Sequence, residues 1–68
     1  MTYSQWAQEY FDNADRIKGN INAIKQQLPT APVGELKEMN FRISVLYQMY
    51  LDCVNIGNTL KKRKGIAF

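Results

Sequence analysis

Hydrophobic residues recur every three or four positions through most of the chain. In the first half the spacing alternates between four and three residues, which places one apolar stripe along a helix and is typical of a heptad repeat. The residues of this stripe are Tyr3, Ala7, Tyr10, Ala14, Ile17, Ile21, Ile24 and Leu28. The pattern predicts a helix over about residues 3–28.

The start of this helix carries its own signal. Thr2 and Gln5 have the spacing of a capping box, in which each side chain accepts a hydrogen bond from the other residue's backbone amide. Gly19 falls on the outer side of the predicted helix, where it costs about 1 kcal/mol relative to alanine without disturbing the packing. Asp12 and Arg16 lie one turn apart, so we expect them to form an ion pair.

The two prolines mark the end of the first pattern. Pro29 and Pro32 lie close together, and neither residue can continue a helix. This segment predicts a loop over about residues 29–34 and a second helix over about 35–64, with Gly65 as its C-terminal cap and a short tail after it. The stripe of the second helix consists of Leu36, Met39, Ile43, Leu46, Tyr50, Cys53, Gly57 and Leu60.

A loop this short between two long helices forces them to run antiparallel. The fold class is therefore all-α, and residues 1–68 form a single helical-hairpin domain. Folding the chain at the loop places Gly57 opposite Trp6, Ala7 and Tyr10, where the absent side chain leaves room for an aromatic ring.

The second helix is apolar around too much of its circumference for a hairpin alone. Apolar side chains cover roughly 240°, whereas a helix facing one neighbour needs a stripe of about 100°. The excess predicts a homodimer in which two hairpins form an antiparallel four-helix bundle with coiled-coil packing; a different protein partner is the alternative. The predicted interface residues are Phe41, Val45, Tyr47, Met49, Leu51, Val54 and Ile56.

Size and composition point the same way. A chain of 68 residues buries only about 60% of its unfolded surface, so it is marginally stable alone, and chains of this size usually need additional support. One cysteine and no histidine exclude an internal disulfide and a zinc ligand set. We expect Cys53 to be a small inert residue of the packed stripe. Without histidine or a glycine-rich phosphate loop, we expect no catalytic residues, no cofactor and no metal, and hence no enzyme.

The net charge of +3 comes from one short run of basic residues. Outside this run the chain has five basic and six acidic residues, a net charge of −1. The run could bind anions such as a nucleic-acid backbone; alternatively, it is a solubilising helix end that complements the helix dipole. We expect Glu9, Asp12 and Asp15 to lie alongside it. The candidate anion-binding residues are Lys61, Lys62, Arg63 and Lys64.

The sequence gives no signal of export or membrane insertion. The first ten residues contain no Lys or Arg and no continuous apolar run, and no apolar segment approaches the length of a membrane span. We therefore expect a cytoplasmic protein. The function predicted is that of a small homo-oligomeric interaction module, an adaptor, scaffold or regulatory subunit; the alternative is a nucleic-acid-associated accessory protein that uses the basic run.

Overall fold

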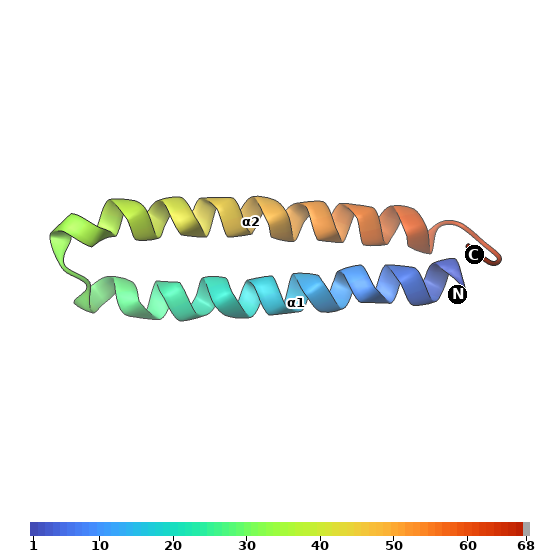
Figure 1. The fold of residues 1–68 in the computed structure, drawn as a ribbon, viewed down its shortest axis with the longest axis horizontal. Helices are drawn as coiled ribbons and strands as arrows, with labels where there is room; N and C mark the ends of the chain where they lie inside the picture. The colour runs from blue at the N-terminus through green and yellow to red at the C-terminus, as the bar shows by residue number, and fades with distance from the viewer. Residues whose placement is uncertain (68) are drawn as a thin grey trace.

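In the computed structural model, which describes residues 1–67, two long helices lie side by side and run in opposite directions (Figure 1). Helix α1 spans Tyr3–Gln27, a short 3-10 turn η1 spans Leu28–Thr30, and helix α2 spans Val33–Lys61. The predicted helical hairpin is confirmed. It forms a rod of 51 × 15 × 14 Å. Phe68, the last residue of the predicted tail, lies outside the described residues.

Helix α1 begins as its capping box predicts. Thr2 has an extended backbone and is the N-cap; its hydroxyl oxygen accepts a hydrogen bond from the Gln5 amide at 3.1 Å. In return, the Thr2 amide donates to Gln5 Oε1 at 2.9 Å. Two amides that have no partner within the helix are thereby satisfied.

The start of α2 is two residues earlier than expected. Pro32 is its N-cap, with φ −58° and ψ 144°, and the Glu35 amide donates to the Pro32 carbonyl oxygen at 2.9 Å. The proline ring fixes a φ that suits the residue before a helix, and the N-cap carbonyl needs no side chain to accept the first helical hydrogen bond. Proline thus ends one helix and starts the next.

The end of α2 corrects the prediction for Gly65. The helix ends at Lys61 rather than near residue 64, and the cap residue Lys62 keeps a right-handed conformation. Gly65 has φ +102°, a left-handed value that favours glycine, but it uses this freedom three residues after the cap. There it turns the tail back toward the start of α1.

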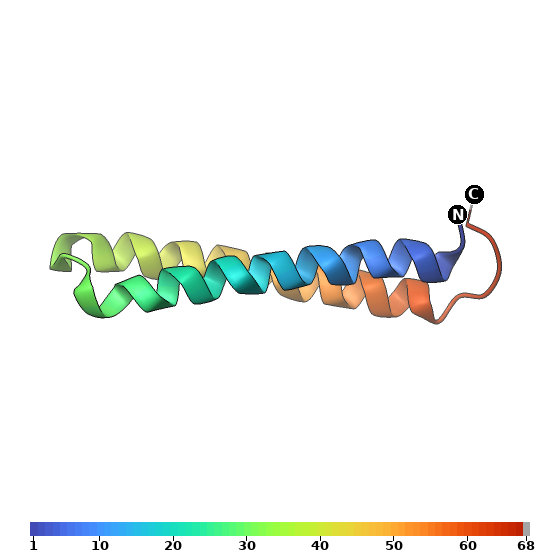
Figure 2. The ribbon, with the colours of Figure 1, turned by 90° about the horizontal axis from the view of Figure 1, so that it is seen from below.

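This return forms a small contact between the two ends of the chain, which we call the terminal clasp (residues 1–3 and 65–67). Ala67 donates its amide hydrogen to the Met1 carbonyl at 3.0 Å, and the Tyr3 amide donates to the Gly65 carbonyl at 3.4 Å. Thr2 and Ile66 pair as an isolated antiparallel bridge between these bonds. Both ends of the described chain therefore lie at the same end of the rod (Figure 2).

The core is the seam between the two helices, which cross near the middle of the rod in Figure 2. Every position of the two predicted stripes is buried or half-buried. Among residues 1–67 the buried hydrophobic side chains are few, and two of the four are alanines: Ala7, Ala14, Ile21 and Leu60. None of the described large side chains is below 2% exposure. The two predicted stripes are confirmed, but the seam that they form buries few side chains completely.

Gly57 lies on this seam, and the aromatic ring beside it belongs to Phe11. A Cβ atom placed on Gly57 would lie 2.8 Å from Phe11 Cε1 and 2.9 Å from Cζ. The prediction of room for a ring was right, and the nearest ring atoms belong to Phe11 rather than to Trp6 or Tyr10. Phe11 follows the predicted stripe by one position, so its ring reaches the seam from the flank.

The predicted charge pairs are only partly present. Arg42 and Glu38 form an exposed ion pair at 3.6 Å, as their spacing suggests. Asp12 instead accepts a hydrogen bond from Gln8 Nε2 at 3.0 Å and forms no ion pair with Arg16. Between side chains of residues 1–67, no ion pair joins the acidic residues of α1 to the basic run.

Neither helix is long and apolar enough to cross a membrane, as judged over residues 1–67.

Candidate interaction surface

Helix α2 exposes a series of large apolar side chains. Phe41 is 68% exposed and Tyr47 is 53% exposed, which is unusual for side chains of this size. Val45, Met49 and Ile56 are each between 42% and 47% exposed. Of the seven predicted interface residues, only Leu51 and Val54 are half-buried within the hairpin.

These residues form two separate faces of α2. Phe41, Val45, Met49 and Ile56 follow one another at spacings of four, four and seven residues, which places them within about 80° of the helix circumference. We call this the Phe41 face. Tyr47, Leu51 and Val54 lie on the other side of the seam and form the Tyr47 face. The seam separates the two faces.

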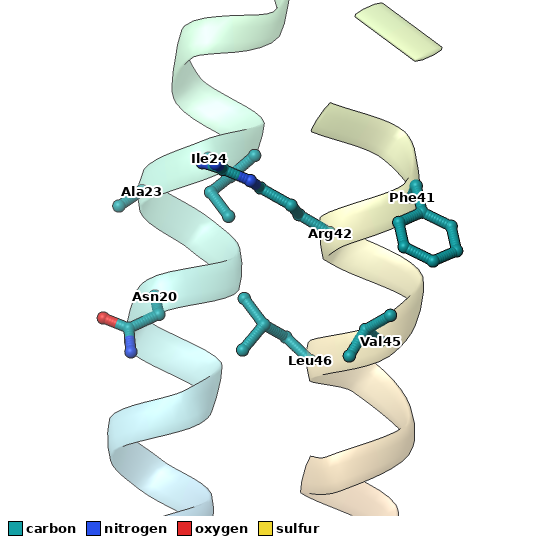
Figure 3. A pocket seen from close by; sticks show the side chains of 7 residues that line it. All are labelled: Asn20, Ala23, Ile24, Phe41, Arg42, Val45 and Leu46. Carbon is teal, nitrogen blue, oxygen red and sulfur yellow. The ribbon is translucent and has the colours of Figure 1, made fainter. Parts of the chain in front are cut away.

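The Phe41 face borders two grooves between the helices. The larger groove, of about 530 Å³, lies toward the turn, and its lining includes Ala23 and Ile24 of α1 and Phe41 and Val45 of α2. Figure 3 shows Phe41 pointing away from α1, while Arg42 extends across toward Ile24.

The second groove lies toward the open end of the hairpin, and Trp6 and Ile56 line it. Sequence reasoning did not assign Trp6 or Ala23 to this surface. Both residues lie next to the stripe of α1, which is the signal that could have identified them.

The Tyr47 face has different surroundings. Tyr47 stacks on Tyr50 with ring centroids 6.1 Å apart and an interplanar angle of 24°. Lys18 and Lys25 of α1 line the adjacent groove together with Tyr47. This face is therefore partly covered and carries two basic residues at its rim.

The basic run lies at the open end of the rod, beside the terminal clasp. All four side chains are exposed. The Arg63 guanidinium lies over the Tyr3 ring, 5.7 Å from its centroid, which is within the range of a cation–π interaction. No local pattern of residues indicates this contact, because Tyr3 and Arg63 are brought together only by the antiparallel fold.

The chain offers little polar chemistry within its core. None of the residues 1–67 is a buried polar or charged residue, and within that range no three Cys, Asp or Glu side chains gather as metal ligands would. Cys53 is a free, half-buried thiol on the seam. The surfaces that stand out are the two apolar faces of α2 and the basic run.

Comparison with models of known protein families, with curated proteins and with solved structures finds no match to this chain.

Proposed function

We propose that this chain is a small non-enzymatic interaction module that works as a homodimer. Two hairpins would pack with their α2 helices at the centre of a four-helix bundle, and the assembly would serve as an adaptor, scaffold or regulatory subunit. The observation that carries the proposal is the row of exposed apolar side chains on α2, beside a seam that buries few side chains of its own.

The exposed area supports a second copy as the partner. The chain exposes 5225 Å², about 800 Å² more than the roughly 4,400 Å² that surface scaling gives for a compact monomer of its mass. A stable protein interface of standard size covers about 800 Å² on each partner. One further hairpin on α2 would cover an area of this size.

The shape leads to the same conclusion. The radius of gyration is 15.6 Å, whereas a compact domain of this length has about 11 Å. A rod two helices wide cannot enclose side chains on all sides, since each helix faces only one neighbour. Adding a second layer of helices would give α2 the additional neighbours that its apolar circumference requires.

The test is a glutamate on the half-buried part of α2. We expect Leu51→Glu and Val54→Glu to give monomeric, largely unfolded protein, because both side chains are half-buried within the hairpin and the dimer requires a folded hairpin. Sedimentation gives the mass and circular dichroism gives the helix content. Gln26→Glu, which adds the same charge at an exposed position of α1, serves as the control and should stay dimeric.

A well-folded wild-type monomer at micromolar concentration would contradict this proposal. So would a Leu51→Glu variant that keeps both the mass and the helix content of the wild type.

A second candidate function is binding to a nucleic-acid backbone through Lys61, Lys62, Arg63 and Lys64. It is favoured by one observation, that none of these side chains forms an ion pair with an acidic side chain among residues 1–67. Each lysine or arginine that contacts a phosphate makes binding salt-dependent through counterion release.

For this candidate we expect a mobility shift of nonspecific DNA or RNA at low salt that weakens as salt is raised. Changing all four residues to alanine should abolish the shift while leaving the dimer intact. The absence of any shift of the wild type at low salt would remove the candidate.

A further inference from the structure

The two apolar faces of α2 differ in how much the hairpin itself covers them. On the Tyr47 face, Leu51 and Val54 are already half-buried, and Tyr47 stacks on Tyr50. On the Phe41 face, all four side chains are exposed, and Phe41 is the most exposed of them. The larger uncovered apolar area is therefore on the Phe41 face.

The rims of the two faces also differ in charge. Lys18 and Lys25 border the Tyr47 face, so a twofold contact there would bring the same two lysines of both copies together. The groove residues that α1 contributes beside the Phe41 face are uncharged: Trp6, Asn20, Ala23 and Ile24. The grooves of the Phe41 face also contain Arg42 and Arg63, but Arg42 is paired with Glu38 and Arg63 lies over the Tyr3 ring. Repulsion between the lysines thus disfavours the Tyr47 face as the contact with a second copy.

The Phe41 face is built to match itself in the antiparallel direction. Its first residue is Phe41, its last is Ile56, and the midpoint of the row falls beside Met49. A twofold axis at Met49 would place Phe41 of each copy next to Ile56 of the other. Ile56 borders the open-end groove that Trp6 also lines, and this groove would receive the exposed Phe41 ring.

The charges on this face fit the same axis. Asp52 lies within the sector of the Phe41 face. It accepts a hydrogen bond from Gln48 Nε2 at 3.2 Å but forms no ion pair with the side chains of residues 1–67, so burying its charge at an interface would be costly. Arg42 lies at the edge of the face, and the midpoint between Arg42 and Asp52 falls within one turn of Met49. An antiparallel pair would therefore bring Asp52 of each copy near Arg42 of the other, whereas a parallel pair would bring the two Asp52 carboxylates together.

We infer that the second copy of this chain docks on the Phe41 face, with the two α2 helices antiparallel and the twofold axis beside Met49. This inference rests on the proposed homodimer and specifies its geometry. The contact row is Phe41, Val45, Met49 and Ile56, and Tyr47 lies on the far side of the seam from it.

The test uses single cysteines in a Cys53→Ala background, so that each chain carries one thiol. A disulfide requires Cα atoms within about 7 Å, which only residues near the axis satisfy with their own copy. Under mild oxidation, Met49→Cys should give at least tenfold more covalent dimer than Tyr47→Cys. Both positions are exposed in the hairpin, so the two variants are matched.

The direction of the helices is tested by mixing two variants. Phe41→Cys and Ile56→Cys, exchanged together and then oxidised, should give mainly the mixed disulfide, which mass spectrometry distinguishes from either self-linked pair. Preferential self-linking of Phe41→Cys would overturn the antiparallel arrangement, and preferential linking of Tyr47→Cys would overturn the choice of face.

Sedimentation of the same variants separates this inference from the proposed function. Dimers that link through Tyr47→Cys contradict only the geometry. Monomers that link through none of these positions contradict the homodimer itself and the geometry with it.

Discussion

At the scale of single residues, Gly57 is the position where a missing side chain determines the packing. A glycine inside a helix costs about 1 kcal/mol relative to alanine, and Gly19 carries this cost with open space around it. At Gly57 the same cost leaves room for the Phe11 ring, which a Cβ atom would approach to 2.8 Å. An alanine at Gly19 would therefore fit without a clash, whereas an alanine at Gly57 would displace the Phe11 ring.

We predict that Gly57→Ala lowers the free energy of unfolding by about 1 kcal/mol, because displacing the Phe11 ring outweighs the gain in helix propensity. Gly19→Ala, the matched control, should raise it by about 1 kcal/mol. Urea denaturation measures both changes. In a Phe11→Ala background the effect of Gly57→Ala should change sign, and a loss of stability that persists there would show that Phe11 is not its cause.

At the scale of elements, local sequence rules predict the two helices, but they predict the helix ends only in part. The heptad spacing, the Thr2 capping box and the prolines predict the hairpin, because each acts within a few residues. The role of Gly65 could not be predicted in this way. Its positive φ serves the terminal clasp, whose partners Met1 and Tyr3 are at the other end of the sequence. The ring beside Gly57 was misassigned for a similar reason, since it depends on how the flank of α1 meets α2.

We predict that Gly65→Ala weakens the terminal clasp without unfolding the helices. A side chain at a φ of +102° costs about 1 to 2 kcal/mol, so the Ala67 amide should exchange with solvent about 5- to 30-fold faster. Amides in the middle of α1 should keep their exchange rates. Gly34 has open space around it and no positive φ, so Gly34→Ala should leave the exchange rate of the Ala67 amide unchanged. Equal acceleration in both variants would contradict the role given to Gly65.

At the scale of the whole molecule, the apolar surplus of α2 could be predicted from its sequence pattern, but its division into two unequal faces could not. Leu51 and Val54 are half-buried although they lie off the predicted stripe. Their cover depends on the side chains that α1 places next to them, which no property of α2 alone determines. The sequence also left open which side of α2 borders the lysines of α1.

If the folded state is a dimer, its stability depends on concentration. We predict that the apparent free energy of unfolding, per mole of dimer, rises by about 1.4 kcal/mol for each tenfold increase in protein concentration, with a matching rise in the melting temperature. Thermal unfolding at 1, 10 and 100 micromolar measures this. A melting temperature that stays constant across this range would indicate a hairpin that folds alone.

The terminal clasp holds residues 65–67 against the first residues of the chain, so groups attached at either terminus would lie at the same end of the 51 Å rod. In the proposed antiparallel dimer, the attached groups of the two copies would lie at opposite ends of the assembly. The proposed dimer would thereby set the distance between two larger proteins attached to it.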